Sequence, residues 1–182
     1  MSALDEAMEK ALKLFFSLKD DDWVEWIAQE NDWQDDCDKF NGCHFIVKQM
    51  PKYPQHKNCR CKLNKISKPI PNITAKAYCD IRKFTEYVFD EIKNQGKKAI
   101  FESLGHTVND SEYLQNLFTS QAVQKYCNGD YVYKGTNDYS ARIQIAININ
   151  TKDGKTLRIK TGWSLKPNGE IKLSTPFSGF AN

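Results

Sequence analysis

The segment YPQHKNCRCKL, residues 53–63, places one histidine and two cysteines within six positions, among basic residues. A Cys-x-Cys pair closes a strained ring if it forms a disulfide with itself, whereas both of its thiolates can face one metal ion. Cys37 lies upstream, and Cys43 and His44 are further candidate ligands. The favoured set is a Cys₃His site typical of structural zinc, made of Cys37, His56, Cys59 and Cys61.

Two alternatives to zinc stay open at the level of sequence. The four cysteines of residues 37–61 could form disulfides in an oxidising compartment, or remain unconnected thiols in a reducing cytosol. A structural metal would explain how a segment with few core residues folds. A catalytic zinc is disfavoured, because no glutamate lies beside the ligands to act as general base.

A second chemical feature is a row of cations near the C-terminal end. Isoleucine alternates with other residues in ARIQIAININ, residues 141–150, which predicts a strand with one buried face. On the opposite face of this strand and the next two, we expect cations without a carboxylate, a natural surface for a polyanion such as RNA. The expected RNA-binding residues include aromatic rings that could stack on bases, and they are Tyr139, Arg158, Trp163 and Lys172.

The same surface has residue types suited to a metal-free ribonuclease. Residues 131–182 hold only three carboxylates, too few and too scattered for a metal-dependent nuclease. A metal-free enzyme needs a base for the 2′-OH, cations for the phosphorane and an acid for the leaving oxygen. We assign His106 as base or acid, Arg142 and Lys160 as phosphate ligands, and Thr175 as an orienting group. No cofactor is expected for catalysis.

Two parts of the chain must position these residues. Apolar spacing predicts a helix over residues 3–18 and a second short helix, begun by Asp20–Asp22, that carries two tryptophans. Residues 33–66 have no clean period and are expected to form a loop-rich Cys/His knuckle. The prolines of residues 67–74 mark a linker. We therefore expect residues 1–72 as a helical N-terminus with the knuckle, and residues 73–182 as a second domain.

The second domain is predicted to be α+β. One helix has an apolar face and is interrupted by Gly96, the face being made by Ile81, Phe84, Val88 and Ile92. Asn109, with Glu112 three residues later, predicts the start of a strong helix that ends at Asn128-Gly129. Three strands joined by short turns follow as an antiparallel meander. The expected fold is therefore an N-terminal helical and Cys-rich module followed by helices packed on a small antiparallel sheet.

Charge and hydropathy restrict the partners further. Residues 1–36 hold three lysines against eleven carboxylates, whereas residues 131–182 hold eight basic residues against three acidic ones. No apolar run approaches the roughly 20 residues that span a bilayer, and the acidic start is unlike a secretory signal. We expect no membrane partner, and the cytoplasm as the site of action.

The knuckle motif carries a family resemblance. Cys37-x-x-Phe40-Asn41-Gly42, then Pro51 and His56-x-x-Cys59-x-Cys61, resembles the C-terminal signature of Mu-like phage minor head proteins. This chain departs from that signature with Lys57 in place of a proline and with no cysteine three residues before Cys37. The resemblance covers residues 33–66 and implies a phage head context, or a knuckle carried into a larger toxin.

A second resemblance covers residues 75–182. Its ordered motifs are Asn-Gly-Asp-Tyr after a helix, Tyr-x-x-Arg-Ile on a strand, Thr161-Gly162-Trp163, Pro167-Asn168-Gly169, and Ser174-Thr175-Pro176-Phe177. This set is similar to the barnase–EndoU–colicin–RelE (BECR) nuclease superfamily, in its phage-associated and polymorphic-toxin branches. The resemblance implies helices on a four-stranded antiparallel sheet and metal-independent cleavage of RNA, often tRNA. A toxic activity would in turn imply an immunity protein as partner, acidic so as to cover the cationic face. By position the resemblance transfers Arg142, Thr161 and Thr175.

A different class of function remains open beside the ribonuclease. The chain could be a non-catalytic phage or prophage adaptor that binds nucleic acid or a capsid protein. The feature that separates the two hypotheses is whether His106 approaches Arg142 and Thr175 across the sheet.

Overall fold

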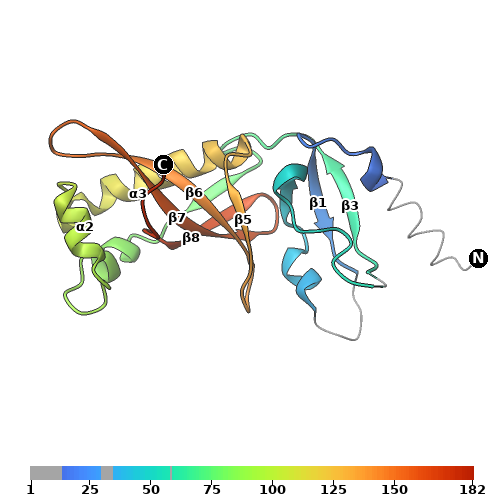
Figure 1. Ribbon diagram of the computed structural model, residues 1–182, viewed down its shortest axis with the longest axis horizontal. Coiled ribbons are helices and arrows are strands. Elements are labelled where there is room, and N and C mark those ends of the chain that lie inside the picture. Colours follow the sequence, from blue (N-terminus) through green and yellow to red (C-terminus); the bar gives the residue numbers. More distant parts are fainter. Residues whose placement is uncertain (1–13, 30–34, 58) are drawn as a thin grey trace, which may run out of the picture.

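The structure is a computed structural model that describes residues 14–29, 35–57 and 59–182 (Figure 1). Helices account for 28% and strands for 31% of the chain, in two sheets, so the predicted α+β class is confirmed. The helix predicted over residues 3–18 lies mostly outside the described residues, and its last part, residues 14–17, is helical. No helix within the described ranges is long and apolar enough to span a membrane.

The N-terminal sheet has three antiparallel strands. Its central strand is β1 (Trp23–Ile27), flanked by β2 (His44–Ile46) and β3 (Lys62–Ile66). The prediction of a short helix at this position was wrong. Aromatic and β-branched residues dominate β1 and favour a pleated surface, and a run of five mostly apolar residues does not distinguish a helix from a buried strand.

The Cys/His segment supplies two strands of this sheet and the turns between them. A short 3₁₀ helix at Asp36–Phe40 is capped by Asp35, whose side chain accepts the N–H of Cys37 at 2.8 Å. A second 3₁₀ turn at Val47–Gln49 follows β2. The expectation of loops is therefore correct only between the strands. The remainder of the segment forms β2 and β3, which pair with β1.

The C-terminal sheet has five strands in the order β4-β8-β7-β6-β5. The predicted meander is present as neighbouring antiparallel strands, with bounds β6 (Ala141–Asn150), β7 (Thr156–Lys166) and β8 (Glu170–Thr175). Two further strands extend it, β5 (Val132–Thr136) antiparallel to β6 and β4 (Lys76–Tyr78) parallel to β8. The parallel edge strand differs from the purely antiparallel, four-stranded sheet that the BECR resemblance implies.

Helix α3 (Ser111–Cys127) packs against this sheet and runs along β6 (Figure 1). It begins one residue later than an N-cap at Asn109 predicts, with Asp110 at the N-cap position. The reciprocal capping pair is instead Thr107 with Asp110, around a 3₁₀ turn at Val108–Asp110. The end of α3 agrees with the sequence prediction, since Gly129 follows it in the left-handed conformation with φ 74°.

The helix predicted through Ile92 is interrupted. The chain forms one π-helical turn at Phe84–Val88, then turns, and then α2 (Lys97–Ser103). Phe84 and Val88 are buried as expected, whereas Ile92 is 92% exposed. The Asp90 side chain accepts the backbone N–H groups of Ile92 and Lys93, which offers the backbone a turn instead of a further helical turn.

One hydrophobic core joins the two sheets. The ring of Trp23 on β1 packs edge-on against Tyr126 of α3, with centroids 5.3 Å apart. The Tyr126 hydroxyl donates to the carbonyl of His44 at 2.8 Å, and the Tyr131 hydroxyl accepts the N–H of Ile46 at 3.1 Å. The N-terminal sheet is therefore fixed to the end of α3 by both apolar packing and buried hydrogen bonds.

A buried polar chain crosses the core beneath β6 and β7. The Trp163 indole N–H donates to the Thr161 hydroxyl at 2.7 Å, and that hydroxyl donates to the carbonyl of Ile145 at 2.7 Å. Thr161 and Trp163 are both 0% exposed. The threonine is thus the group that allows a polar indole to lie inside an isoleucine-rich core.

We expect Thr161→Val to lower the free energy of unfolding by about 1–3 kcal/mol, because the buried Trp163 N–H loses its acceptor while the side-chain volume is kept. Urea denaturation followed by tryptophan fluorescence measures this change. Thr156→Val, at the exposed start of the same strand, is the control and should change stability by less than about 0.5 kcal/mol. Equal losses in the two variants would contradict the role of the buried chain.

Candidate nucleic-acid groove and metal centre

The strand register brings the predicted cations to one face of the C-terminal sheet. Arg142 on β6 is opposite Ser164 on β7, which is opposite Lys172 on β8. Lys160 and Arg158 are opposite Ala146 and Asn148, residues of β6 that project to the same side as Arg142. Residues directly opposite in antiparallel strands share a face, so the expected one-sided arrangement is present.

The expectation of no carboxylate on this face was wrong at one corner. Glu170 lies two residues before Lys172 on β8, opposite Lys166, and so projects to the cationic side. The Tyr78 hydroxyl of β4 donates to its carboxylate at 3.3 Å. The cationic character is therefore strongest toward β6 and weakest toward the parallel edge strand.

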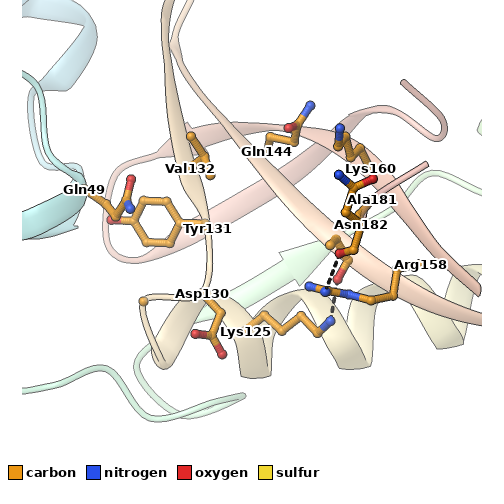
Figure 2. Close-up of a pocket in the computed structure, with 12 residues that line it drawn as sticks. Gln49, Lys125, Asp130, Tyr131, Val132, Gln144, Arg158, Lys160, Ala181 and Asn182 are labelled. Atoms are coloured by element: carbon orange, nitrogen blue, oxygen red, sulfur yellow. Dashed lines mark hydrogen bonds between the residues drawn. The ribbon is translucent and has the colours of Figure 1, made fainter. Parts of the chain in front are cut away.

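A concave site lies at the β6 side of this face. Its cavity has a volume of about 730 Å³ and is lined by Gln49, Lys125, Gly129, Asp130, Tyr131, Val132, Gln144, Ala146, Arg158, Lys160, Ala181 and Asn182. We call this cavity the cationic groove. Two predicted residues, Arg158 and Lys160, line it, whereas Arg142 and Lys172 lie outside it on the open face. Figure 2 shows the Lys125 amine beside the Arg158 guanidinium.

Lys125 was not predicted as a site residue. It belongs to the last turn of α3, and its amine donates to the Ala146 carbonyl. One turn earlier, the Gln121 amide bonds both the N–H and the C=O of Asn148. These two side chains provide hydrogen-bond partners for the backbone groups of β6 that lie beyond the end of β5. The signal in the sequence was the spacing of four residues between Gln121 and Lys125, which places both on one face of the helix. That spacing indicates a site only once the neighbouring strand is known.

Charge in the groove perturbs Lys125. Burial lowers the pKa of its amine, the positive charge of Arg158 lowers it further, and Asp130 opposes both effects. Arg158 itself donates to the backbone oxygen of Asn182 at 2.8 Å. The side chains that line the groove thus include three cations and one carboxylate, an arrangement that an anion such as a phosphate would stabilise.

The segment after β8 forms the wall of the groove opposite β6. It pairs with the edge of β7, where Lys160 N–H donates to the Gly179 carbonyl and Ala181 N–H donates to the Arg158 carbonyl, both at 2.8 Å. Gln144 reaches across Gly162 to the Ser178 hydroxyl at 3.3 Å. Backbone pairing on both sides of β7 therefore holds Arg158 and Lys160 on a rigid strand.

The predicted catalytic set is not assembled. His106 Nε2 lies 3.0 Å from the Asn150 carbonyl, and its ring stacks on Tyr113 beside a separate cavity of about 340 Å³. Thr175 is opposite Gly162, which is opposite Gln144. Asn150 lies six positions after Gln144 on β6, a span of about 20 Å in an extended strand. The assignment of His106 to the site of Arg142 and Thr175 was therefore wrong.

The reason lies in the direction of α3. His106 precedes this helix and meets Asn150, the last residue of β6, whereas Lys125 near the helix end meets Ala146 in the middle of the strand. The loop histidine is consequently placed at the end of β6 that lies away from Arg142. Lys125, at the other end of α3, lines the cationic groove instead.

The two predicted stacking aromatics have different outcomes. Trp163 is 0% exposed and hydrogen-bonded in the core, so its assignment as an RNA-stacking residue was wrong. Tyr139 is 84% exposed in the turn between β5 and β6. Its role in stacking stays a prediction. Trp163 lies in phase with the buried Ile159 and Thr161 along β7, which agrees with its burial.

The Cys/His residues converge on one point of the N-terminal sheet. Cys37 Sγ is 3.5 Å from His56 Nε2 and 3.8 Å from Cys59 Sγ. The three donor atoms lie within 4.8 Å of one another and can bind a metal ion. Cys37 and Cys59 are buried, while the histidine lies at the surface. Three of the four predicted ligands are thus brought together without further assumption.

The surroundings of His56 leave the correct nitrogen for a metal. Its Nδ1 lies 2.9 Å from the Lys57 carbonyl, an acceptor that favours a proton on that nitrogen. In that tautomer, Nε2, which lies 3.5 Å from Cys37 Sγ, can offer its lone pair to a metal ion. The carboxylate of Asp35 also lies 3.1 Å from Nε2.

The thiols fit a cation for an electrostatic reason. Burial, followed by interactions with Cys61 and Cys59, raises the pKa of the Cys37 thiol. The pKa of Cys61 is also raised by burial, so these clustered groups resist ionisation without a counter-charge. All six cysteines are free thiols, and no disulfide joins them. A divalent cation supplies the charge that the buried thiolates need.

Comparison with known proteins assigns part of the chain to a family. Residues 69–178 match a family described as "Domain of unknown function (DUF6883)". The match covers the five-stranded sheet with its helices and leaves out the three-stranded sheet. No curated protein and no solved structure matches the chain.

Proposed function

The chain belongs to the DUF6883 family, and we propose that it binds single-stranded RNA in the cationic groove. The observation that carries this proposal is the convergence of Lys125, Arg158 and Lys160 on one cavity, from a helix and a strand that are distant in sequence. Lysine and arginine side chains that neutralise phosphates supply most of the affinity of such sites. We prefer RNA binding to RNA cleavage by the catalytic residues predicted from the sequence, because His106, the predicted base or acid, does not line the groove.

The shape and lining of the groove favour a single RNA strand. A flexible strand can turn one phosphate into a cavity of about 730 Å³, whereas a duplex holds its phosphates on a stiff cylinder. The amides of Gln49 and Gln144 line the same cavity and can hydrogen-bond to a ribose 2′-OH. From the groove, the strand would continue across the face past Arg142, toward the exposed ring of Tyr139.

We expect the double variant Arg158→Gln/Lys160→Gln to weaken binding of a fluorescently labelled single-stranded RNA and to reduce the salt dependence of log Kd by about one for each lost phosphate contact. Fluorescence anisotropy at several salt concentrations measures both effects. The control is Lys155→Gln, which removes a cation from the β6–β7 turn, where it pairs with Asp153. The groove assignment fails if the control and the double variant lose affinity equally.

A second candidate function, metal-free RNA cleavage, is favoured by the perturbed amine of Lys125. With its pKa lowered, this lysine can exist as a free amine and take the proton of a ribose 2′-OH. The 2′ oxygen would then attack the adjacent phosphorus, and the bond from phosphorus to the 5′ oxygen would break. Lys160 would donate a proton to the leaving oxygen while Arg158 stabilises the phosphorane. Lys125 takes the role that the sequence assigned to His106.

For this second candidate we expect the pure protein to degrade single-stranded RNA in EDTA, and Lys125→Arg to bind RNA but not cleave it, because arginine stays protonated. The rate should rise with pH through the pKa of Lys125, below the range of an ordinary lysine. His106→Ala is the matched control and should cleave at the wild-type rate. RNA that stays intact with the wild type would exclude cleavage and leave the binding proposal standing.

We also propose that the ion of the Cys/His cluster is zinc. Thiolate and imidazole donors suit this borderline-soft ion, and a closed set of four such ligands is typical of structural sites. Cys61, 5% exposed and close to Cys37 and Cys59, is the fourth ligand of the proposed site. The ion would connect the turn at Asp36–Phe40 with the segment that leads into β3.

We expect about one zinc ion per chain by metal analysis, and a lower thermal midpoint after chelation, because an ion that binds only the folded state stabilises it. Zinc should also be released as the pH falls, since protons compete for the thiolates and the imidazole. Cys59→Ser should lose the ion. Cys43→Ser should retain it, since Cys43 contacts the Lys39 carbonyl rather than the cluster. The ligand assignment is wrong if these two variants behave alike.

A further inference from the structure

The indole nitrogen of Trp26 is the starting point for an inference about the metal centre. Trp26, the last residue but one of β1, is 0% exposed, with its ring packed edge-on against Phe40 and Tyr53 at centroid distances of 4.9 and 5.4 Å. Among the described residues, its Nε1 is a buried side-chain atom with no hydrogen-bond partner of normal geometry. An unsatisfied buried donor costs about 1–3 kcal/mol, so its persistence in a well-packed core calls for an acceptor.

The register of the N-terminal sheet places Cys61 beside this indole. Trp26 is opposite Leu63 on β3, and Cys61 lies two residues before Leu63, on the same face and diagonal to Trp26. The Tyr53 hydroxyl donates to the Cys61 carbonyl at 2.8 Å and fixes this part of the backbone. This diagonal position places the Cys61 side chain next to the unsatisfied indole N–H of Trp26.

A neutral thiol is a weak acceptor, whereas a thiolate held by a metal is a good one. We propose that Trp26 donates an N–H···S hydrogen bond to the Cys61 thiolate when the metal ion is bound, and is thereby a positioning residue of the metal centre. The inference rests on the proposed metal site and adds a role that the ligand set does not contain. It gives the orphaned donor its acceptor and gives the sulfur a fixed orientation.

The bond also has an electronic consequence. A hydrogen bond to a metal-bound sulfur withdraws negative charge from it, which changes the sulfur-to-metal charge-transfer energy when cobalt replaces zinc. Cobalt(II) therefore reports on the N–H directly, in addition to affinity. A merely structural tryptophan would alter stability without altering this absorption.

The test compares Trp26→Phe with Trp23→Phe in the full chain. Trp26→Phe keeps an aromatic ring but removes the N–H, and we expect an affinity for zinc about 10-fold lower or more, together with a shifted cobalt charge-transfer band. Trp23→Phe removes an indole from the same strand, where the ring packs on Tyr126, and should change neither quantity. In a Cys61→Ser background, Trp26→Phe should produce no further loss of affinity.

A measurement on the wild type keeps the inference testable if Trp26→Phe fails to fold. The ¹⁵N–¹H indole signal of Trp26 should move when zinc is added to the metal-free protein, while that of Trp23 stays in place. Unchanged affinity and spectrum in Trp26→Phe, or an unmoved Trp26 indole signal, would overturn the hydrogen bond. Absence of any zinc or cobalt binding to the wild type would instead refute the metal site itself.

Discussion

The in-register pairing of β6 with β7 is the constraint on which the rest of the C-terminal structure depends. It places four isoleucines of β6 in the core and, because opposite residues share a face, sends Arg158 and Lys160 to the other side. A shift by one residue would bury the cations and expose the isoleucines. Because burying the cations and exposing the isoleucines would cost much free energy, the register is fixed. Burial of the isoleucine face thereby keeps the cations on the exposed face.

Helix α3 connects the five-stranded sheet with the N-terminal sheet and with the cationic groove. Its buried residues cover the isoleucines, its polar side chains Gln121 and Lys125 complete the edge of β6, and Tyr126 near its end bonds the backbone of β2. The helix that supports the core therefore also contributes a cation to the groove. Orientation of one element thus sets the position of the N-terminal sheet and the composition of the site.

The N-terminal sheet has a different source of order. It is small, and its core is built from Trp26, Phe40 and Phe45 together with buried cysteines. Three donors within 4.8 Å, a histidine tautomer fixed by a backbone carbonyl and a buried indole N–H all meet at one place. A cation there would neutralise thiolates that the surrounding apolar residues disfavour. Packing and coordination then act on the same few side chains.

Local pattern was sufficient for features whose physics is local. Alternation identified β6 and its buried face, turn residues identified the meander, and close spacing of cysteines and histidine identified three residues whose donor atoms converge. The same alternation placed Trp163 inside, and only its aromatic nature suggested a binding role. Pattern failed at Trp23–Ile27, where a short apolar run fits a helix or a strand equally well and pairing with two neighbours decides.

The sequence by itself determined the α+β class, the cationic face and the cluster of Cys37, His56 and Cys59, because each follows from side-chain periodicity or spacing along the chain. Only the tertiary structure decided which polar residues meet. The packing of α3 along β6 places His106 at the Asn150 end of the strand, away from Arg142 and Thr175, and brings Lys125 to Arg158 and Lys160, over a separation that no local pattern encodes. Whether residues distant in sequence come into contact depends on how whole helices and strands pack against one another, and that packing cannot be read from a single sequence.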